Sequence, residues 1–270
     1  MPEEESWQDK VKKYCEKYNV PILYLSDTLY EPKVVPMIRG KSFEFSVMVA
    51  LQEILPTSVW EVIKTPSNAQ MGVHDVDVLI KHRSPEREFR VECKLASKGS
   101  FRSTNGGFEL EVKCMRSRTL GQSMVETLAP QLGVTKRQLT THNDQYLPAD
   151  FDIVATSIGN AFYETDSATG LFEWKPSATA VEFLNIICGE HTENGDDLKD
   201  LAFNKIYVAK SQDLAITASN NITCTRRRCT SKINCGFIPN YPKIIFRSGE
   251  TAPEHPWVEI GNIQELILGS

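Results

Sequence analysis

The sequence predicts an α/β protein with a central mixed β-sheet flanked by helices. Three observations lead to this fold class: a helical apolar pattern over about 41–55, an expected hairpin built from "DVDVLIKH" and "FRVECKLA", and an alternation of helix-like and strand-like segments after it. At 270 residues the chain is long enough to bury a core of ordinary size. It contains no internal repeat or obvious linker, so we expect a single domain over 1–270.

The first expected helix runs from about Lys41 to Leu55. Gly40 precedes it and Pro56 ends it, and apolar residues recur at helical spacing in the segment between them. Those residues are Phe43, Val47, Ala50, Leu51 and Ile54. The next segment, "VWEVIK", is expected to be a strand.

Two alternating runs then form the expected hairpin, with "RSPER" between them and Pro85 marking the turn. Downstream, "SRTLGQSMVETLAPQLG" is expected to be a helix that stops at Gly133. "FDIVATSIGNAFYE" should be one long strand, "SATAVEFLNIIC" a helix with Ser177 as its N-cap, and "NKIYVAK" another strand. From about Thr217 we expect short strands mixed with basic and cysteine-rich loops.

The composition indicates a soluble cytoplasmic protein. The N-terminus lacks the basic start and apolar stretch of a signal peptide, and no apolar run has the length of a membrane helix. The seven cysteines are an odd number without the spacing of a disulfide framework. A net charge of −5 argues against indiscriminate coating of nucleic acid, but it leaves room for a local basic cleft beside an acidic metal site.

Charged residues interrupt both apolar runs of the hairpin. Asp75 and Asp77 share one face of the first run, and Glu92 and Lys94 share one face of the second, because side chains two apart in a strand project together. A turn centred between Ser84 and Pro85 sets Asp77 opposite Glu92 and Asp75 opposite Lys94. Opposed carboxylates repel each other, and a divalent cation between them reverses that effect. The alternative to a metal site is a solvated outer face of the hairpin, on which Asp75 and Lys94 form an ion pair.

The chemistry that fits this pattern is phosphodiester hydrolysis with Mg²⁺. Mg²⁺ binds oxygen ligands and takes only one or two protein carboxylates. The metal would polarise the phosphate and lower the pKa of a bound water, while Lys94 would orient or deprotonate that water and neutralise the developing charge.

"DVDVLI", a loop and then "VECK" resemble the PD-(D/E)xK nuclease superfamily, in which an acidic residue on one strand precedes a (D/E)xK motif on the next. The resemblance implies a restriction-endonuclease-like fold and adds Glu44, on the first core helix, as an outer catalytic ligand. The proline that precedes the first aspartate in the family is absent here, so Asp75 and Asp77 both remain candidate metal ligands. Asp77 is favoured, because an uninterrupted apolar run follows it and Glu92 lies opposite.

By size, the chain is most similar to the Type II restriction endonucleases of that superfamily. The resemblance implies cleavage of double-stranded DNA at a specific site by a homodimer, since a two-fold protein suits a palindrome. The catalytic core would span about 40–210, and 211–270 would be a DNA-recognition elaboration.

Local basic clusters supply candidate DNA contacts, because such residues bind phosphates and arginine also reads guanine. The candidates are Lys98, Arg116, Arg118, Arg226, Arg227 and Arg228. The last three lie within "CTRRRCTSKINC". We interpret Cys224, Cys229 and Cys235 in this segment as free cytoplasmic thiols; a zinc site would need a distant fourth ligand such as Cys188 or His191.

Other functions fit parts of this pattern. A repair or junction nuclease of the same fold would carry the same catalytic residues. A non-catalytic DNA-binding module would retain the fold with a vestigial acidic face, although Asp77, Glu92 and Lys94 are all intact. A sugar-nucleotide transferase using a DxD motif would need a nucleotide-binding fold before Asp75, and no Gly-rich loop precedes it.

Overall fold

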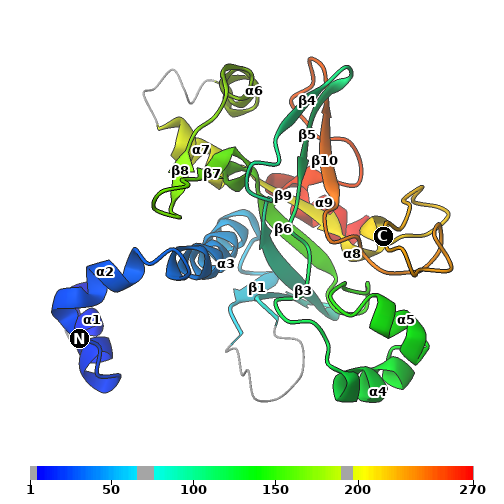
Figure 1. The fold of residues 1–270 in the computed structure, drawn as a ribbon, viewed down its shortest axis with the longest axis horizontal. Coiled ribbons are helices and arrows are strands. Elements are labelled where there is room, and N and C mark those ends of the chain that lie inside the picture. The colour runs from blue at the N-terminus through cyan, green and yellow to red at the C-terminus, as the bar shows by residue number, and fades with distance from the viewer. Residues whose placement is uncertain (1–4, 66–75, 190–196, 270) are drawn as a thin grey trace.

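The computed structural model describes residues 5–65, 76–189 and 197–269 (Figure 1). Its centre is a six-stranded mixed sheet in which β3 and β6 run parallel and the other neighbouring strands antiparallel. Helices flank this sheet, so the expected architecture is confirmed. The strands, in sheet order, are β1 (Trp60–Ile63), β2 (Val78–Arg83), β3 (Glu86–Leu95), β6 (Ile153–Ser157), β9 (Ile206–Lys210) and β11 (Val258–Glu259).

Two smaller sheets and a set of mostly short helices surround the central sheet. One small sheet consists of β4 (Arg102–Thr104), β5 (Gly107–Glu111) and β10 (Lys243–Arg247), and the other of β7 (Tyr163–Thr165) and β8 (Phe172–Trp174). The α-helices are α1 (Trp7–Lys17), α2 (Leu25–Leu29), α3 (Val34–Ile54), α4 (Gln122–Gln131), α5 (Lys136–Thr141), α6 (Ala178–Cys188), α7 (Leu198–Asn204), α8 (Ser211–Leu214) and α9 (Ile263–Leu268). The 3₁₀ helices are η1 (Ile22–Tyr24), η2 (Ile158–Phe162) and η4 (Ile260–Asn262).

Helix α3 ends close to the predicted residue but begins at Val34, seven residues before the predicted start at Lys41. Pro36 does not prevent this, because it lies in the first turn, where backbone N–H groups have no partner within the helix. Gly40 does not end the helix either, and no neighbouring atom packs against its Cβ position. The face of α3 that carries Phe43, Val47 and Leu51 is buried against the central sheet.

The hairpin has the predicted register. Val78 pairs with Val91, and Arg83 pairs with Glu86, so the turn is centred between Ser84 and Pro85. Val78 and Val91 are both buried in the core beneath α3. This register places the end of β3 beside the residue that precedes β2, and the candidate site lies there.

The prediction of one long strand over "FDIVATSIGNAFYE" is wrong. Strand β6 ends at Ser157, whose hydroxyl accepts a hydrogen bond from the N–H of Gly159 and starts η2. A Cβ on Gly159 would lie 2.8 Å from the Phe203 backbone, so this turn packs directly against α7. Helix α6 matches its prediction, because the Ser177 hydroxyl caps it by accepting from the N–H of Ala180.

Three apolar cores hold the fold together. One lies between α3, α9 and the central sheet. A second covers the opposite face of that sheet with residues of β5, β10 and α6, among them Phe246 and Phe183. The third joins α4 and α5 to the segment 215–242 and includes Leu139, Cys224 and Phe237.

Residues 5–33 form an N-terminal arm, which contains α1, η1 and α2 and projects from the sheet in Figure 1. Large apolar side chains are exposed along it, including Trp7 (69% exposed) and Leu23 (86% exposed). Exposed apolar surface of this kind is typical of a protein contact. None of the helices in the described residues is both long and apolar enough to cross a membrane.

Candidate metal-binding carboxylate site

Glu92 lies on β3, one of the two parallel central strands, and its side chain is only 3% exposed. Lys94 Nζ lies 2.5 Å from Glu92 Oε1, and the Tyr146 hydroxyl donates a hydrogen bond of 2.9 Å to the same oxygen. Burial alone would lower the pKa of Lys94, but the charge of Glu92 and its hydrogen bond, together with Tyr146 and Asp77, outweigh burial and raise that pKa well above its ordinary value. Lys94 is therefore an ammonium ion at neutral pH.

Asp77 lies immediately before β2, at the end of the hairpin ladder. Its Oδ2 accepts a hydrogen bond of 2.9 Å from the backbone N–H of Cys93. Burial, together with the negative charges of Glu92 and Glu44, raises the pKa of Asp77 to about 7. The site therefore disfavours a charge on Asp77, as expected of carboxylates gathered without a cation.

Glu44 lies on α3 and is buried. Lys41 Nζ lies 2.7 Å from its Oε1, and Lys64, which follows β1, forms an ion pair with its Oε2. Glu44 also contributes to the raised pKa of Asp77. Both of its carboxylate oxygens are thus paired with lysines. Glu44 is therefore suited to a position outside the direct coordination of a metal ion.

The structure brings four of the predicted residues into one electrostatic neighbourhood: Glu44, Asp77, Glu92 and Lys94. Asp75 lies outside the described residues. Sequence reasoning missed Tyr146, Lys64 and Lys41. Lys64 stood at the end of the predicted strand "VWEVIK" and could have been noted there. Tyr146 gave no local signal, because it follows Glu92 by more than fifty positions.

This arrangement combines candidate oxygen ligands for a hard cation with a positive charge beside them. Asp77 and Glu92 offer oxygen ligands suited to Mg²⁺, and one or two carboxylates are as many as such a site requires. Lys94 places a fixed positive charge beside Glu92, where it can neutralise an anionic transition state.

Two of the predicted DNA contacts near the central sheet already have intramolecular partners. Lys98 Nζ hydrogen-bonds to Thr165 and lies 4.1 Å from the centre of the Phe172 ring. The Arg116 guanidinium lies 2.5 Å from Asp150 and is largely buried. Arg116 therefore stabilises the loop that precedes α4.

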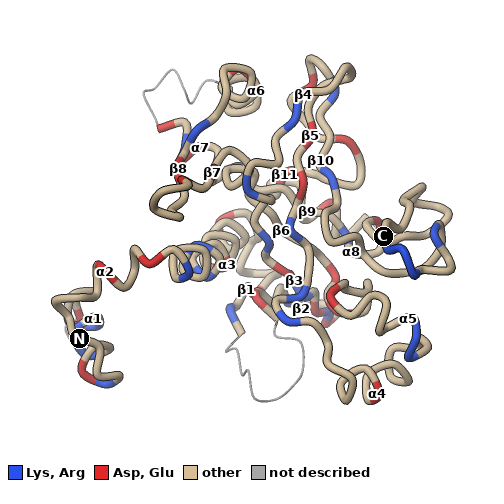
Figure 2. Tube along the Cα trace, in the orientation of Figure 1, with Lys and Arg blue, Asp and Glu red and all other residues tan. Residues whose placement is uncertain are grey.

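The other predicted DNA contacts lie on loops. Arg118, Arg227 and Arg228 are exposed, whereas Arg226 forms an ion pair with Asp144. In Figure 2, basic residues lie along the loop formed by 215–242 and on the neighbouring α5. The exposed side chains are free to reach a phosphate, while Arg226 holds its loop in place.

The three C-terminal cysteines come together, but with a different partner from the predicted ones. The fourth side chain beside Cys224, Cys229 and Cys235 is His142, at the end of α5. Cys188 instead ends α6 and packs in the second apolar core, and His191 lies outside the described residues.

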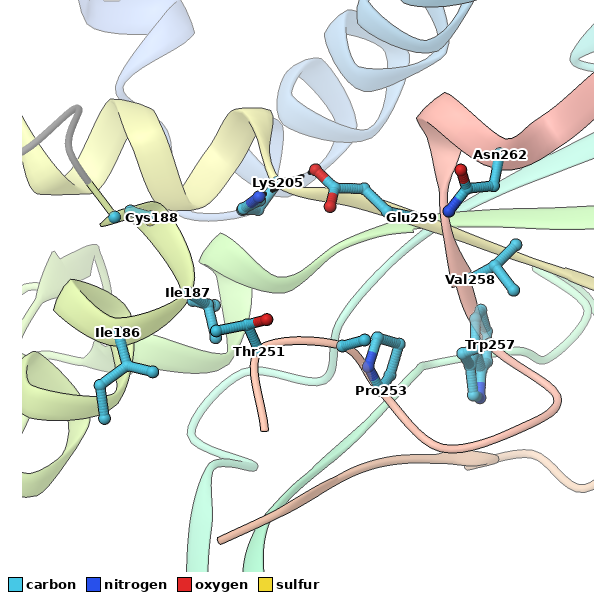
Figure 3. Close-up of a pocket in the computed structure, with 12 residues that line it drawn as sticks. Ile186, Ile187, Cys188, Lys205, Thr251, Pro253, Trp257, Val258, Glu259 and Asn262 are labelled. Carbon is cyan, nitrogen blue, oxygen red and sulfur yellow. Dashed lines mark hydrogen bonds and ion pairs between the residues drawn. The ribbon is translucent and has the colours of Figure 1, made fainter. Parts of the chain in front are cut away.

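A separate hollow of about 580 Å³ lies at the C-terminal end of α6 (Figure 3). Its charged residues, Lys205 and Glu259, form an ion pair of 2.8 Å with each other. Because these two charges offset each other, this hollow offers no net charge to a phosphate or to a metal ion.

Comparisons of the chain with protein-family models, curated protein sequences and solved structures give no significant match. Function is therefore inferred from the chemistry of the side chains described above.

Proposed function

We propose that this protein is a Mg²⁺-dependent, site-specific endonuclease for double-stranded DNA, with a restriction-endonuclease-like fold of the PD-(D/E)xK superfamily. The observation that carries the proposal is the pairing of half-buried Asp77 with buried Glu92 at the end of two central strands, with Lys94 beside them. In the metal-free protein, the negative charges of the two neighbouring carboxylates repel each other and lower the stability of the fold. A bound cation would remove this repulsion.

Each residue has a role in this proposal. Asp77 and Glu92 hold the metal ion, and Glu44 acts from the outer shell through its lysine partners. A bound Mg²⁺ would polarise the scissile phosphate and lower the pKa of a water. Lys94 remains protonated beside Glu92, so we assign it the neutralisation of charge on the phosphate and the orientation of the attacking water, rather than proton abstraction.

The substrate and the assembly follow from charge and from exposed surface. Arg118, Arg227 and Arg228 would contact the DNA, and Lys98 would do so by exchanging its contact with Thr165 for a phosphate, while Arg116 and Arg226 position their loops through ion pairs with Asp150 and Asp144. The exposed apolar side chains of the N-terminal arm support a homodimer, which suits a palindromic site.

The test is cleavage of unmethylated phage DNA with Mg²⁺, beside Asp77→Asn and Glu92→Gln. Glu88→Gln is the matched control, because Glu88 lies on β3 but is exposed and pairs with Lys81 away from the site. Discrete fragments from the wild type and the control, with none from the two site variants, are the expected result. Ca²⁺ in place of Mg²⁺ should permit binding without cleavage.

Two results would contradict the proposal. Equal cleavage by wild type and Glu92→Gln would assign the activity to another site or to a contaminant. DNA binding without cleavage under Mg²⁺ or Mn²⁺ would instead indicate a non-catalytic binding module.

A further inference from the structure

The side chains of His142, Cys224, Cys229 and Cys235 converge in the third apolar core, with their ligand atoms all within 4.8 Å of one another. A tetrahedral zinc ion with Zn–S bonds of about 2.3 Å places its ligand atoms roughly 3.5 to 4 Å apart. The four side chains therefore need to move little to reach that geometry. We refer to them as the Cys₃His cluster.

The orientation of His142 supports a metal ligand. Its Nδ1 lies 2.5 Å from the side-chain oxygen of Gln145, which can only accept a hydrogen bond, so Nδ1 carries the proton. Nε2 is then the nitrogen with a free lone pair. A metal-binding histidine commonly donates its other N–H to a carbonyl or carboxylate in this way.

Two further contacts fix this histidine. The Gln145 amide nitrogen donates to the Ile238 carbonyl at 2.9 Å, which sets the direction of its oxygen. The His142 ring stacks on Phe237, with the ring centres 4.3 Å apart. His142 is held by the same segment that carries the cysteines.

A metal cross-link would stabilise the segment 215–242. It contains no helix and no strand, and a connection of that length without secondary structure is uncommon in a compact protein. Nevertheless, Cys224, Cys235 and Phe237 are buried. Hydrogen bonds such as Cys224 N–H to the Lys232 carbonyl, 2.7 Å, bring the loop back on itself around the cysteines.

The local charge also suits a metal–thiolate centre. Three thiolates and one Zn²⁺ leave a net negative charge, and positive side chains lie close by. Lys232 donates to the Arg226 carbonyl, and the Arg226 side chain reaches Gln145, the residue that orients His142. A disulfide would join only two of the three sulfur atoms and would leave the histidine without a role.

We propose that the Cys₃His cluster is a structural zinc site that fastens the segment 215–242 to α5. All four positions around the ion are filled by the protein, which is the mark of a structural site rather than a catalytic one. The zinc would thereby hold the loop that carries Arg226, Arg227 and Arg228. This proposal is independent of the nuclease proposal and concerns a different metal.

The test begins with the zinc content of the wild-type chain, expressed with added zinc and purified with reductant and a weak chelator. We expect one zinc per chain by elemental analysis. Replacement by Co²⁺ should give a sulfur-to-metal charge-transfer band and the intense visible bands of a tetrahedral ion, which a carboxylate site does not produce.

Variants then locate the metal. Cys229→Ser removes the least buried cysteine of the cluster and should lower zinc content by at least about tenfold, whereas Cys188→Ser, a buried thiol outside the cluster, should leave it unchanged. Gln145→Ala should weaken zinc binding about 10- to 100-fold, because His142 loses its orienting partner.

Several results would overturn the inference. They are wild-type protein without zinc and without a cobalt–sulfur band, a disulfide between two of the three cysteines in reductant-treated protein, and a Cys229→Ser chain that retains the wild-type zinc content. Loss of folding in a variant does not obscure the outcome, because zinc content and the cobalt spectrum are measured on the wild type.

Discussion

Lys94 Nζ lies 2.5 Å from Oε1 of Glu92, the residue two positions earlier on the same strand. The pair corresponds to the (D/E)xK part of the proposed nuclease motif, and its spacing places both side chains on one face of β3. Glu92 is buried and Lys94 is half-buried, so each is stabilised in its charged form by the other.

Removal of the lysine alone should therefore destabilise the protein. Lys94→Met leaves the buried Glu92 carboxylate without its cation, and we expect a loss of about 3 to 5 kcal/mol in the free energy of unfolding. Glu92→Gln combined with Lys94→Met should recover much of it. Urea denaturation of the single and double variants measures both effects, and equal stability of the two would contradict a coupled pair.

Asp77→Asn should stabilise the metal-free protein at pH 8 by on the order of 2 kcal/mol, because it removes a charge that burial and Glu92 disfavour while retaining an oxygen for the Cys93 N–H. The variant should also lose the stabilisation by Mg²⁺ that we expect for the wild type. Thermal unfolding with and without Mg²⁺ tests this prediction. A variant that is less stable than the wild type in the absence of metal would contradict it.

The same residue sets a pH dependence. The pKa of Asp77 is raised from 3.8 to about 7 in the folded chain, so the folded state binds a proton that the unfolded state has lost. Its contribution to stability is complete below about pH 4 and disappears as the pH rises through about 7. The Asp77→Asn variant should lack this component, so its advantage over the wild type should grow from pH 5 to pH 8 in urea denaturation. A constant difference would mean that Asp77 ionises normally.

Tyr146→Phe should separate the hydrogen bond to Glu92 from the packing of the ring. We expect about 1 to 2 kcal/mol less stability and a weaker affinity for Mg²⁺, because the carboxylate loses its hydroxyl donor. Tyr241→Phe is the control, since its hydroxyl is exposed and remote in sequence from the site. Calorimetric titration with Mg²⁺ measures the affinity, and an unchanged value would restrict Tyr146 to a packing role.

The N-terminal arm should mediate association between chains. Leu23→Asp places a charge at the most exposed apolar position of the arm, and we expect it to weaken a dimer at least about tenfold. Lys10→Asp, on α1, is the control for a change of charge. Light scattering after size-exclusion chromatography measures the mass, and a wild type that is monomeric at all concentrations would refute the prediction.

The register of the hairpin was predictable because its information is local. Alternation defines both strands and Pro85 marks the turn, which together set the register that brings Asp77 beside Glu92. The N-cap of α6 was predictable for the same reason, since Ser177 directly precedes an apolar helical pattern.

The failures have a common physical cause. The end of β6 is set by the close packing of Gly159 on Phe203. Helix α3 begins before Pro36 and Gly40, two residues that usually end a helix but that its first turns accommodate. His142 joins the cysteines from the end of a helix far earlier in the chain, and Tyr146 reaches Glu92 from a loop more than fifty positions later. Contacts between distant segments leave no periodic pattern in the sequence.

The hydrogen bond from the Cys93 N–H to Asp77 has a spectroscopic consequence. The ladder of backbone hydrogen bonds between β2 and β3 ends beside Cys93, and there the Asp77 carboxylate accepts the hydrogen bond from the Cys93 N–H. The environment of this one amide proton therefore depends on the charge of Asp77. The amide resonance of Cys93 should move with pH near neutrality and move again when a cation binds the carboxylate. A single backbone signal thus becomes an intrinsic sensor of the site, readable without any substrate.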